Sequence, residues 1–210
     1  MLKYEKLPVD FQKELTFGSG ILCTEFAPET GEIDAGKILG AFQNNGFSIN
    51  VKRDIVNVFD NIGNAPKNMK EGIRTDAWNI NCGGTLLTIN PEILKKLLGN
   101  GLINTVTPTS TGLTYKTVKP TFDVANDDFS TLWYVTNYTD KNNDVTGTSA
   151  VTAGFFSVKM ENCLSTSGFS FQSVDREKGS CSFEFTAYGS ISSPDDVPVT
   201  FVTYDPNDED

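Results

Sequence analysis

The chain has 210 residues, of which 27 are acidic and 17 basic, so its formal net charge is −10. A surface with this charge repels phosphate groups, and we therefore expect no tight binding to nucleic acid. The sequence contains no histidine. This removes the commonest general base and the commonest metal ligand, so we expect no enzymatic activity and no metal or other cofactor. The length suits one domain, residues 1–210, with enough aromatic side chains to fill a sizeable core.

The termini and the cysteines indicate a reduced protein made in the cytoplasm. Residues 1–17 are mixed and charged and look like an arm without the apolar stretch of a signal peptide, and residues 205–210 form an acidic tail. No apolar run approaches the ~20 residues of a membrane helix. The four cysteines form no C-x-x-C pair. We therefore predict reduced and mostly buried thiols and no zinc site.

The first half of the chain predicts strands separated by one long loop. A strand is expected near GSGILCTEF and a long one over GFSINVKRDIVNVF, residues 46–59. Phe47, Ile49 and Val51 would share one face of the long strand, with polar residues on the other. Residues 60–77 hold only three large apolar side chains and show no sustained period, so they predict a loop. A loop of this length in a compact domain is usually functional.

A further strand and the one clear helix follow. WNINCGGTLLTI predicts a strand in which Gly83-Gly84 suggests a bulge. Residues 90–99 predict an α-helix, because Asn90 can cap it, Pro91 fits its first turn and Gly99 can end it.

The second half alternates short strands with polar turns. In CSFEFTAYGSI, Phe183 and Phe185 alternate with Glu184, which predicts a strand with one buried and one polar face. One helix among many strands predicts a mainly β fold, with two packed β-sheets in a sandwich or barrel-like arrangement. The other strands are expected at GLTYKTV, TLWYVTNY, AGFFSVKME, GFSFQSV and VPVTFVTY.

Two short patterns imitate ligand sites. GEIDAGKI, residues 31–38, matches most of a phosphate-binding loop, but Ile38 lacks the hydroxyl that would bind magnesium. DKNNDVTG begins like a calcium loop, with Asp140, Asn142 and Asp144, but lacks the required glycine. We interpret both as turns.

The order of several segments resembles the major tail proteins, or tail tube proteins, of long-tailed phages and prophages of Gram-positive bacteria. The segments are TLWYV and GFFSVKMENCLSTSGFSFQSVDREKGSCSFEFTAYGSISSPDDVPVTFV, preceded by FGSGILCTEFAP and DAWNINCGGTLLTINPEILKKLLGNG. The resemblance covers nearly the whole chain. It implies two β-sheets packed across one another with one flanking helix, and a structural virion protein without catalytic residues. Its subunits would form hexameric rings that stack into a hollow tube for DNA.

The resemblance also implies partners and an interface. The partners would be further copies of the chain, the tail-tip or initiator protein, the tape measure protein and the tail terminator, with transient passage of DNA and no membrane. The loop at about residues 60–77 would join neighbouring subunits or rings. Its candidate interface residues are Asp60, Ile62, Lys67, Met69, Lys70, Ile73 and Arg74.

Polar strand faces are the candidates for the channel wall. Weak repulsion would keep DNA sliding, whereas many cations would bind it. Lys52 and Lys159 share the predicted faces, so the wall would be mixed in charge. The candidates are Asn50, Asp54, Glu161, Gln172 and Glu184.

Other functions stay open at this point. The chain could be the tube protein of a contractile tail or of a related secretion machine. It could also be a carbohydrate-binding β-sandwich of a tail-associated protein, with Trp78, Trp133 and Tyr134 as a stacking platform, although core packing suits Trp133 and Tyr134 better. A cysteine-dependent enzyme would lack a base.

Overall fold

The computed structural model describes residues 16, 20–40, 42–60, 62–64, 69–110, 112–138, 154–173, 176 and 178–204, with the backbone alone at 43–45. The acidic tail, the calcium-like pattern at 140–144 and Lys67 lie outside the described residues, as does the N-terminal arm apart from Thr16.

The chain is mainly β, as the sequence predicts, and the described residues contain a single α-helix. The helix, α1, spans Pro91–Leu97. The strands are β1 Ile21–Cys23, β2 Phe42–Asn57, β3 Ile73–Leu86, β4 Leu102–Val106, β5 Tyr115–Lys119, β6 Ser130–Asn137, β7 Phe155–Ser165, β8 Ser170–Gln172, β9 Ser180–Ala187 and β10 Val199–Tyr204. Short 3₁₀ turns lie at Ala35–Lys37, Lys70–Gly72 and Asn126–Asp128.

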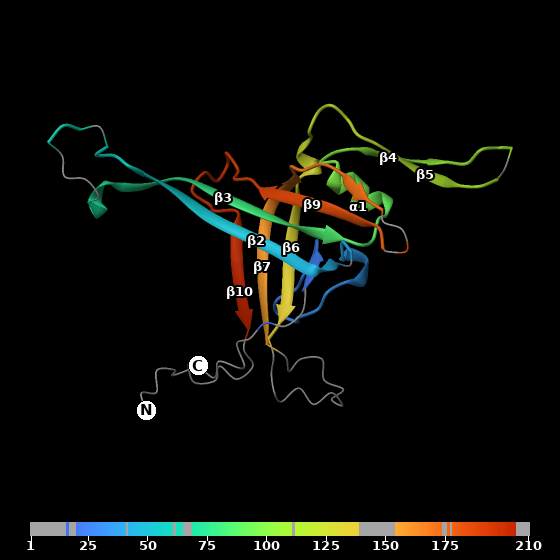
Figure 1. Ribbon diagram of the computed structural model, residues 1–210, viewed down its shortest axis with the longest axis horizontal. Helices are drawn as coiled ribbons and strands as arrows, with labels where there is room; N and C mark the ends of the chain where they lie inside the picture. The colour runs from blue at the N-terminus through green and yellow to red at the C-terminus, as the bar shows by residue number, and fades with distance from the viewer. Residues whose placement is uncertain are drawn as a thin grey trace.

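Eight of these strands form one antiparallel sheet that folds into two layers. Strands β10, β7, β6 and β1 form an upright layer, and β8, β9, β3 and β2 cross in front of it (Figure 1). Strands β4 and β5 form a separate two-stranded sheet. The structure thus confirms a crossed sandwich of β layers with a flanking helix, and the described strands form no closed barrel.

The two layers join at a corner in β7. This strand pairs with β10 up to Met160 and then with β9 from Cys163 to Ser165. Between these stretches Asn162 adopts a φ of 50°, in the left-handed region that asparagine tolerates better than most residues. The Asn162 side-chain amide donates to the Tyr188 carbonyl at 3.1 Å, and the Tyr188 N–H donates to the Asn162 carbonyl at 3.2 Å. These bonds fix the direction in which the chain changes layer.

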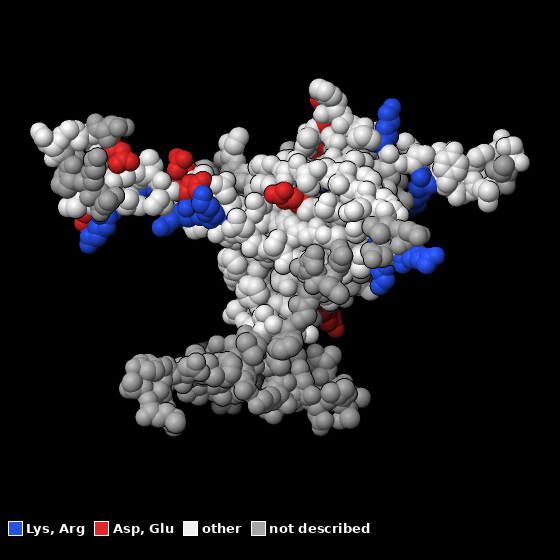
Figure 2. All heavy atoms as spheres, in the orientation of Figure 1, with Lys and Arg blue, Asp and Glu red and all other residues white. Residues whose placement is uncertain are grey.

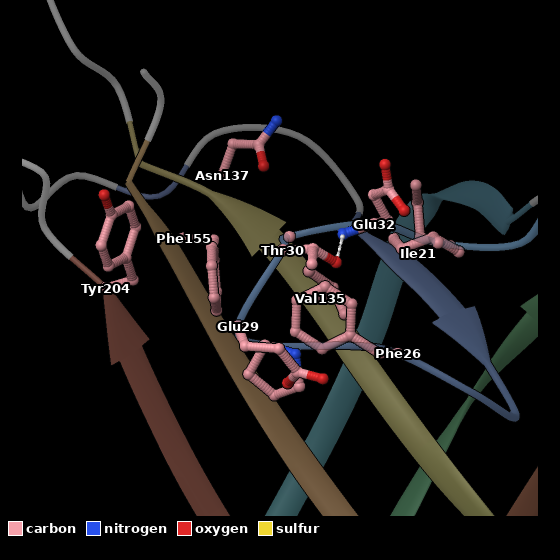
Figure 3. A pocket seen from close by; sticks show the side chains of 12 residues that line it. Ile21, Phe26, Glu29, Thr30, Glu32, Val135, Asn137, Phe155 and Tyr204 are labelled. Atoms are coloured by element: carbon pink, nitrogen blue, oxygen red, sulfur yellow. Dashed lines mark hydrogen bonds between the residues drawn. The ribbon is translucent and has the colours of Figure 1, made fainter. Parts of the chain in front are cut away.

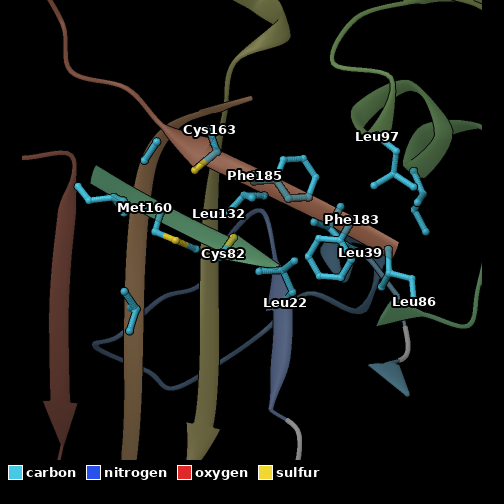
Figure 4. Close-up of a cluster of buried hydrophobic side chains, with 14 of the residues drawn as sticks. Leu22, Leu39, Cys82, Leu86, Leu97, Leu132, Met160, Cys163, Phe183 and Phe185 are labelled. Carbon is cyan, nitrogen blue, oxygen red and sulfur yellow. The ribbon is translucent and has the colours of Figure 1, made fainter. Parts of the chain in front are cut away.

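The main core lies between the crossed layers (Figure 4). Alternation in β9 turns Phe183 and Phe185 inward, as predicted, and leaves Glu184 exposed. The other fully or nearly buried members come from β3, β6, β7, β9, α1 and the N-terminal segments: Leu22, Leu39, Ile80, Cys82, Leu86, Ile93, Leu97, Leu132, Val158, Met160, Cys163, Cys181 and Ala187. A smaller core of Cys23, Phe26, Trp133, Val135 and Phe155 covers the opposite face of the upright layer.

The helix has the predicted cap and ends slightly earlier than predicted. The Asn90 side chain accepts from the Ile93 N–H at 2.8 Å. Ile93 and Leu97 are buried in the main core, so the helix closes one end of the space between the layers. Gly99 follows with a φ of 77°, which ends the helix as expected.

Glycines 83 and 84 allow close packing and do not form a bulge of their own. Both residues stay in register with β9. A Cβ atom at Gly83 would lie 2.9 Å from the Phe183 carbonyl oxygen, and one at Gly84 would lie 2.9 Å from the Gly46 carbonyl oxygen. The irregularity lies in β2, between Phe42 and Phe47, where Gly46 adopts a φ of 72°.

The predicted loop at 60–77 is shorter than expected. Its last part, from Ile73, belongs to β3 and pairs with the end of β2, Asn57 opposite Ile73. The pairing shifts between Asp54 and Ile55 of β2, where β3 contributes one residue more than β2. This extra residue interrupts the alternation of apolar and polar side chains that is expected of a strand. The two strands form a hairpin that extends far out of the body (Figure 1). We call residues 55–60, 62–64 and 69–76 the β2–β3 arm.

Substitutions at the corner should separate backbone strain from other effects. Asn162→Gly keeps the left-handed backbone accessible and removes only the side-chain bond to Tyr188, so it should cost about 1 kcal/mol. Asn162→Val places a β-branched residue in that backbone conformation and also removes the bond to Tyr188. The free energy of unfolding should therefore fall by about 2–4 kcal/mol. Urea unfolding followed by tryptophan fluorescence measures the difference. Because both variants lose the side-chain bond to Tyr188, equal stability of the two would show that the left-handed backbone at residue 162 does not decide the stability of the corner.

Candidate assembly surfaces

The crossing layer presents a broad polar face away from the core. The pairing of β9, β3 and β2 sets Glu184 opposite Gly83, Asn81 opposite Asn50 and Asn79 opposite Lys52. Paired residues point to the same side of a sheet, so this face consists mostly of short polar side chains. Figure 2 shows few charged side chains over the body on this side. We call it the polar face; its members are Ser48, Asn50, Lys52, Asp54, Asn79, Asn81, Gly83, Thr85, Gln172, Ser180, Ser182, Glu184 and Thr186.

Four of the five predicted channel residues lie on the polar face. Asn50 and Asp54 lie on β2, Glu184 on β9, and Gln172 on β8 opposite Ser180. Asp54 accepts from the Asn79 amide, and its carboxylate lies 2.9 Å from the Lys52 ammonium. Two carboxylates and one ammonium on a large area give the mixed, weakly acidic character that the sequence predicts.

Glu161 does not join this group. It lies on β7, in the upright layer, and forms an ion pair with Lys159. The Lys159 ammonium also lies 5.8 Å from the centre of the Trp133 ring, in the smaller core. Glu161 and Lys159 therefore face the side of the upright layer that points away from the polar face. The sequence could not assign Glu161 and the four other candidates to different layers. Alternation shows on which side of its own strand a residue lies, but not to which layer that strand belongs.

The β2–β3 arm exposes large apolar side chains. Of the predicted interface residues, Asp60, Ile62, Met69, Lys70 and Arg74 are exposed, whereas Ile73 is half-buried. The Arg74 guanidinium donates to the carbonyls of Glu71 and Ile73, at 2.8 and 2.9 Å, which stiffens the return into β3. The sequence interpretation missed Ile55, Val56 and Val58, which are also exposed. The sequence does carry a signal for them: three of the four residues at 55–58 are aliphatic, directly after a stretch in which polar and apolar residues alternate.

A second hairpin, β4–β5, projects from the opposite end (Figure 1). The sequence predicts β5 but not β4, whose residues LINTV lack a clear alternation. Leu102 and Tyr115 point to the same side of this small sheet and are exposed, and Leu113 at its tip is 72% exposed. Two adjoining residues, Phe122 and Val124, are exposed as well.

A pocket of about 600 Å³ lies beside the smaller core (Figure 3). Phe26, Val135 and Phe155 line its apolar part, and Glu29 and Glu32 contribute carboxylates. The Glu32 N–H donates to the Thr30 hydroxyl at 3.4 Å, which shapes the turn above the pocket. None of the residues that line it is basic or a cysteine.

The segment that resembles a phosphate loop is a turn, as expected. The Asp34 carboxylate accepts from the Gly36 N–H at 2.8 Å and caps a 3₁₀ turn over Ala35–Lys37. Lys37 forms an ion pair with Glu25, and Ile38 is already extended. No helix therefore starts where a phosphate would need one.

Trp78, Trp133 and Tyr134 do not come together as an exposed stacking platform. Trp133 is only 9% exposed and packs edge-on against Phe26, with 5.5 Å between the ring centres. Tyr134 is half-buried and stacks on Phe47 in the main core, at 4.7 Å. Trp78 is 39% exposed, but the Arg53 guanidinium lies 5.9 Å from the centre of its ring.

The cysteines are all free and buried, as the sequence predicts. Burial raises the pKa of the Cys23 thiol to about 11 and that of Cys163 to about 12. Burial also raises the pKa of Cys82 and of Cys181. The neutral thiol is a weak nucleophile, so these residues act as small apolar members of the core.

Neither a metal cluster nor a membrane helix is found in the part of the chain that the structure describes. These residues contain no group of three acidic or cysteine side chains placed to hold a metal ion. None of their helices has the length and apolar character needed to cross a membrane.

No protein-family model matches the chain, and no curated protein matches its sequence.

The buried thiols should make the protein sensitive to alkali. A raised pKa in the folded state means that the stabilisation is complete below the pKa of the unfolded thiol, ~8.5, and is lost as pH rises toward the folded value. The urea midpoint should therefore fall between about pH 9 and pH 11. It should fall more gently in a Cys82→Ala/Cys163→Ala variant, compared with that variant's own midpoint at neutral pH.

The burial of the thiols can also be tested by chemical modification. At pH 8 a thiol reagent should modify the cysteines of the native protein slowly and all the cysteines of the protein in urea rapidly. Rapid modification of the native protein would contradict this burial.

Proposed function

We propose that this protein is a structural tail tube protein, whose subunits associate into hexameric rings that stack into a hollow tube. The observation that carries the proposal is the β2–β3 arm. Five large apolar side chains are exposed on it, Ile55, Val56, Val58, Ile62 and Met69, and it extends away from the body of its own subunit. Exposed apolar patches of this kind mark surfaces of association. The resemblance in segment order provides the second support.

The sheet also offers unpaired edges. In the described sheet β2 is an end strand, and β10 pairs only with β7. Free edges carry unsatisfied backbone donors and acceptors that a neighbouring chain can complete. Contacts between unlike surfaces close into a ring when the rotation between subunits allows it.

The polar face suits the wall of a channel for DNA. Its short side chains and single ammonium provide few groups that would hold phosphates. In this proposal the protein belongs to the tail of a virion, is made in the bacterial cytoplasm, and meets tail-tip, tape measure and terminator proteins. A contractile tail or secretion machine would use the same geometry.

Apolar contacts of the arm should drive assembly. In a concentration series, with and without tail-tip proteins, we expect light scattering and negative-stain microscopy to find rings or tubes. Val56→Asp/Val58→Asp places charge on the arm and should raise the concentration needed for assembly by at least about tenfold, since each buried charge costs several kcal/mol. The urea midpoint should barely change, because both side chains are exposed.

Ile89→Asp is the matched control, because Ile89 is an exposed aliphatic residue outside the arm. It should leave assembly intact. A wild-type protein that stays monomeric under every condition would overturn the proposed function. Equal assembly of the arm variant and the control would instead remove the arm from the interface.

The polar face can be tested separately by charge reversal. Glu184→Lys should leave tubes intact but slow DNA ejection from virions, most strongly at low salt, because the added cation binds phosphate. Glu161→Lys makes the same change on the other layer and should eject normally. Ejection rates of the two virions at several salt concentrations give the comparison. If Glu161→Lys slows ejection and Glu184→Lys does not, the wall is assigned to the wrong layer.

A further inference from the structure

A cleft of about 550 Å³ lies where the β2–β3 arm leaves the body. One wall is the start of β3, with Asp76 and Trp78, and the other is the segment between β9 and β10, with Asp195, Asp196 and Val197. Figure 1 shows this segment beside β3, on the side of the body away from β4 and β5. The cleft is therefore a groove with an acidic rim and some apolar surface from Trp78 and Val197.

The charge of this cleft has little internal compensation. No lysine or arginine lines it. The Arg53 guanidinium lies over the Trp78 ring, 5.9 Å from its centre. The residues that line the groove thus include three carboxylates and no cation, which favours a cationic partner.

The β4–β5 hairpin has the complementary chemistry. Its register places Leu102 opposite Lys119 and Val106 opposite Tyr115, so these four side chains share one face of the small sheet. Lys116 lies opposite Thr105, on the other face. Residues 101–119 contain no acidic residue. Figure 2 shows basic side chains and no acidic one along the projecting hairpin.

The hairpin packs against its own subunit only at its base. Its contacts with the body are mainly with α1, and Leu102, Leu113 and Tyr115 are exposed. A two-stranded sheet in water is only marginally stable by itself. A partner that covers its apolar face would stabilise it.

We propose that the β4–β5 hairpin of one copy docks into the acidic cleft of a second copy, head to tail. Lys119, which shares a face with Leu102 and Tyr115, would lie near the Asp76, Asp195 and Asp196 carboxylates, and Leu102, Leu113 and Tyr115 would cover Trp78 and Val197. Lys116, on the other face, would add to the positive charge that the hairpin carries toward the cleft. The occupant is a second copy because the two surfaces match in charge and lie at opposite ends of the same chain. Such a contact joins unlike surfaces and repeats from subunit to subunit. The inference rests on the proposed assembly and specifies one of its contacts.

Charge reversal on each side tests this contact. Lys116→Glu/Lys119→Glu makes the hairpin acidic, and Asp76→Lys/Asp195→Lys/Asp196→Lys makes the cleft basic. Each variant alone would then set like charges against each other at every contact. We expect each to need at least about a tenfold higher concentration than wild type to assemble.

An equimolar mixture of the two variants should assemble like the wild type. The acidic hairpin of one meets the basic cleft of the other, while the native hairpin and the native cleft also meet. Lys37→Glu/Lys178→Glu is the control for the hairpin variant, because it makes the same change in net charge outside the hairpin, and it should assemble normally. Urea midpoints establish that every variant is folded. Light scattering and microscopy are the readouts.

The outcomes separate the two proposals. Recovery in the mixture alone supports the docking. If the wild type assembles but the variants assemble equally well, or the mixture fails like its components, the docking is wrong and the tube function stands. A wild type that never associates overturns both.

Discussion

The fold depends on one strand serving two layers. Strand β7 pairs with β6 and β10 in the upright layer and ends beside β9 in the crossing layer. The turn at Asn162 sets the angle between the layers, and the main core fills the space that this angle creates. The positions of the polar face and of the two hairpins follow from this crossing of the layers. The crossing directs the polar face outward and places the β2–β3 arm and the β4–β5 hairpin at opposite ends.

The sequence predicted the parts of the fold that short-range patterns determine. The alternation in residues 181–187 predicted both the strand and the inward direction of Phe183 and Phe185. In a sheet with one buried face, apolar residues at every second position can only point toward that face. The helix followed from the Asn90 cap and its glycine stop. The turn at 31–38 followed from the missing hydroxyl of Ile38.

The parts that it missed depend on contacts between distant segments. Strand β4 has almost no pattern of its own and is a strand because it pairs with β5. The start of β3 lost its alternation at the register shift opposite Asp54 and Ile55, so paired strand residues resembled a loop. Glu161 and Glu184 looked equivalent because both alternate with buried residues. Only the corner at Asn162 assigns them to different layers, and the acidic cleft combines segments more than a hundred residues apart.

In the proposed assembly, the polar face would also determine how a subunit is oriented. Asn, Ser and Thr side chains, with glycine at Gly83, give a surface of low relief that holds water through many short donors and acceptors. It offers almost no apolar area to bury, so covering it would remove hydration without a compensating gain. Neighbouring subunits would therefore gather around the other sides and leave this one wet. A surface that does not bind can thus specify orientation in an assembly as firmly as one that does.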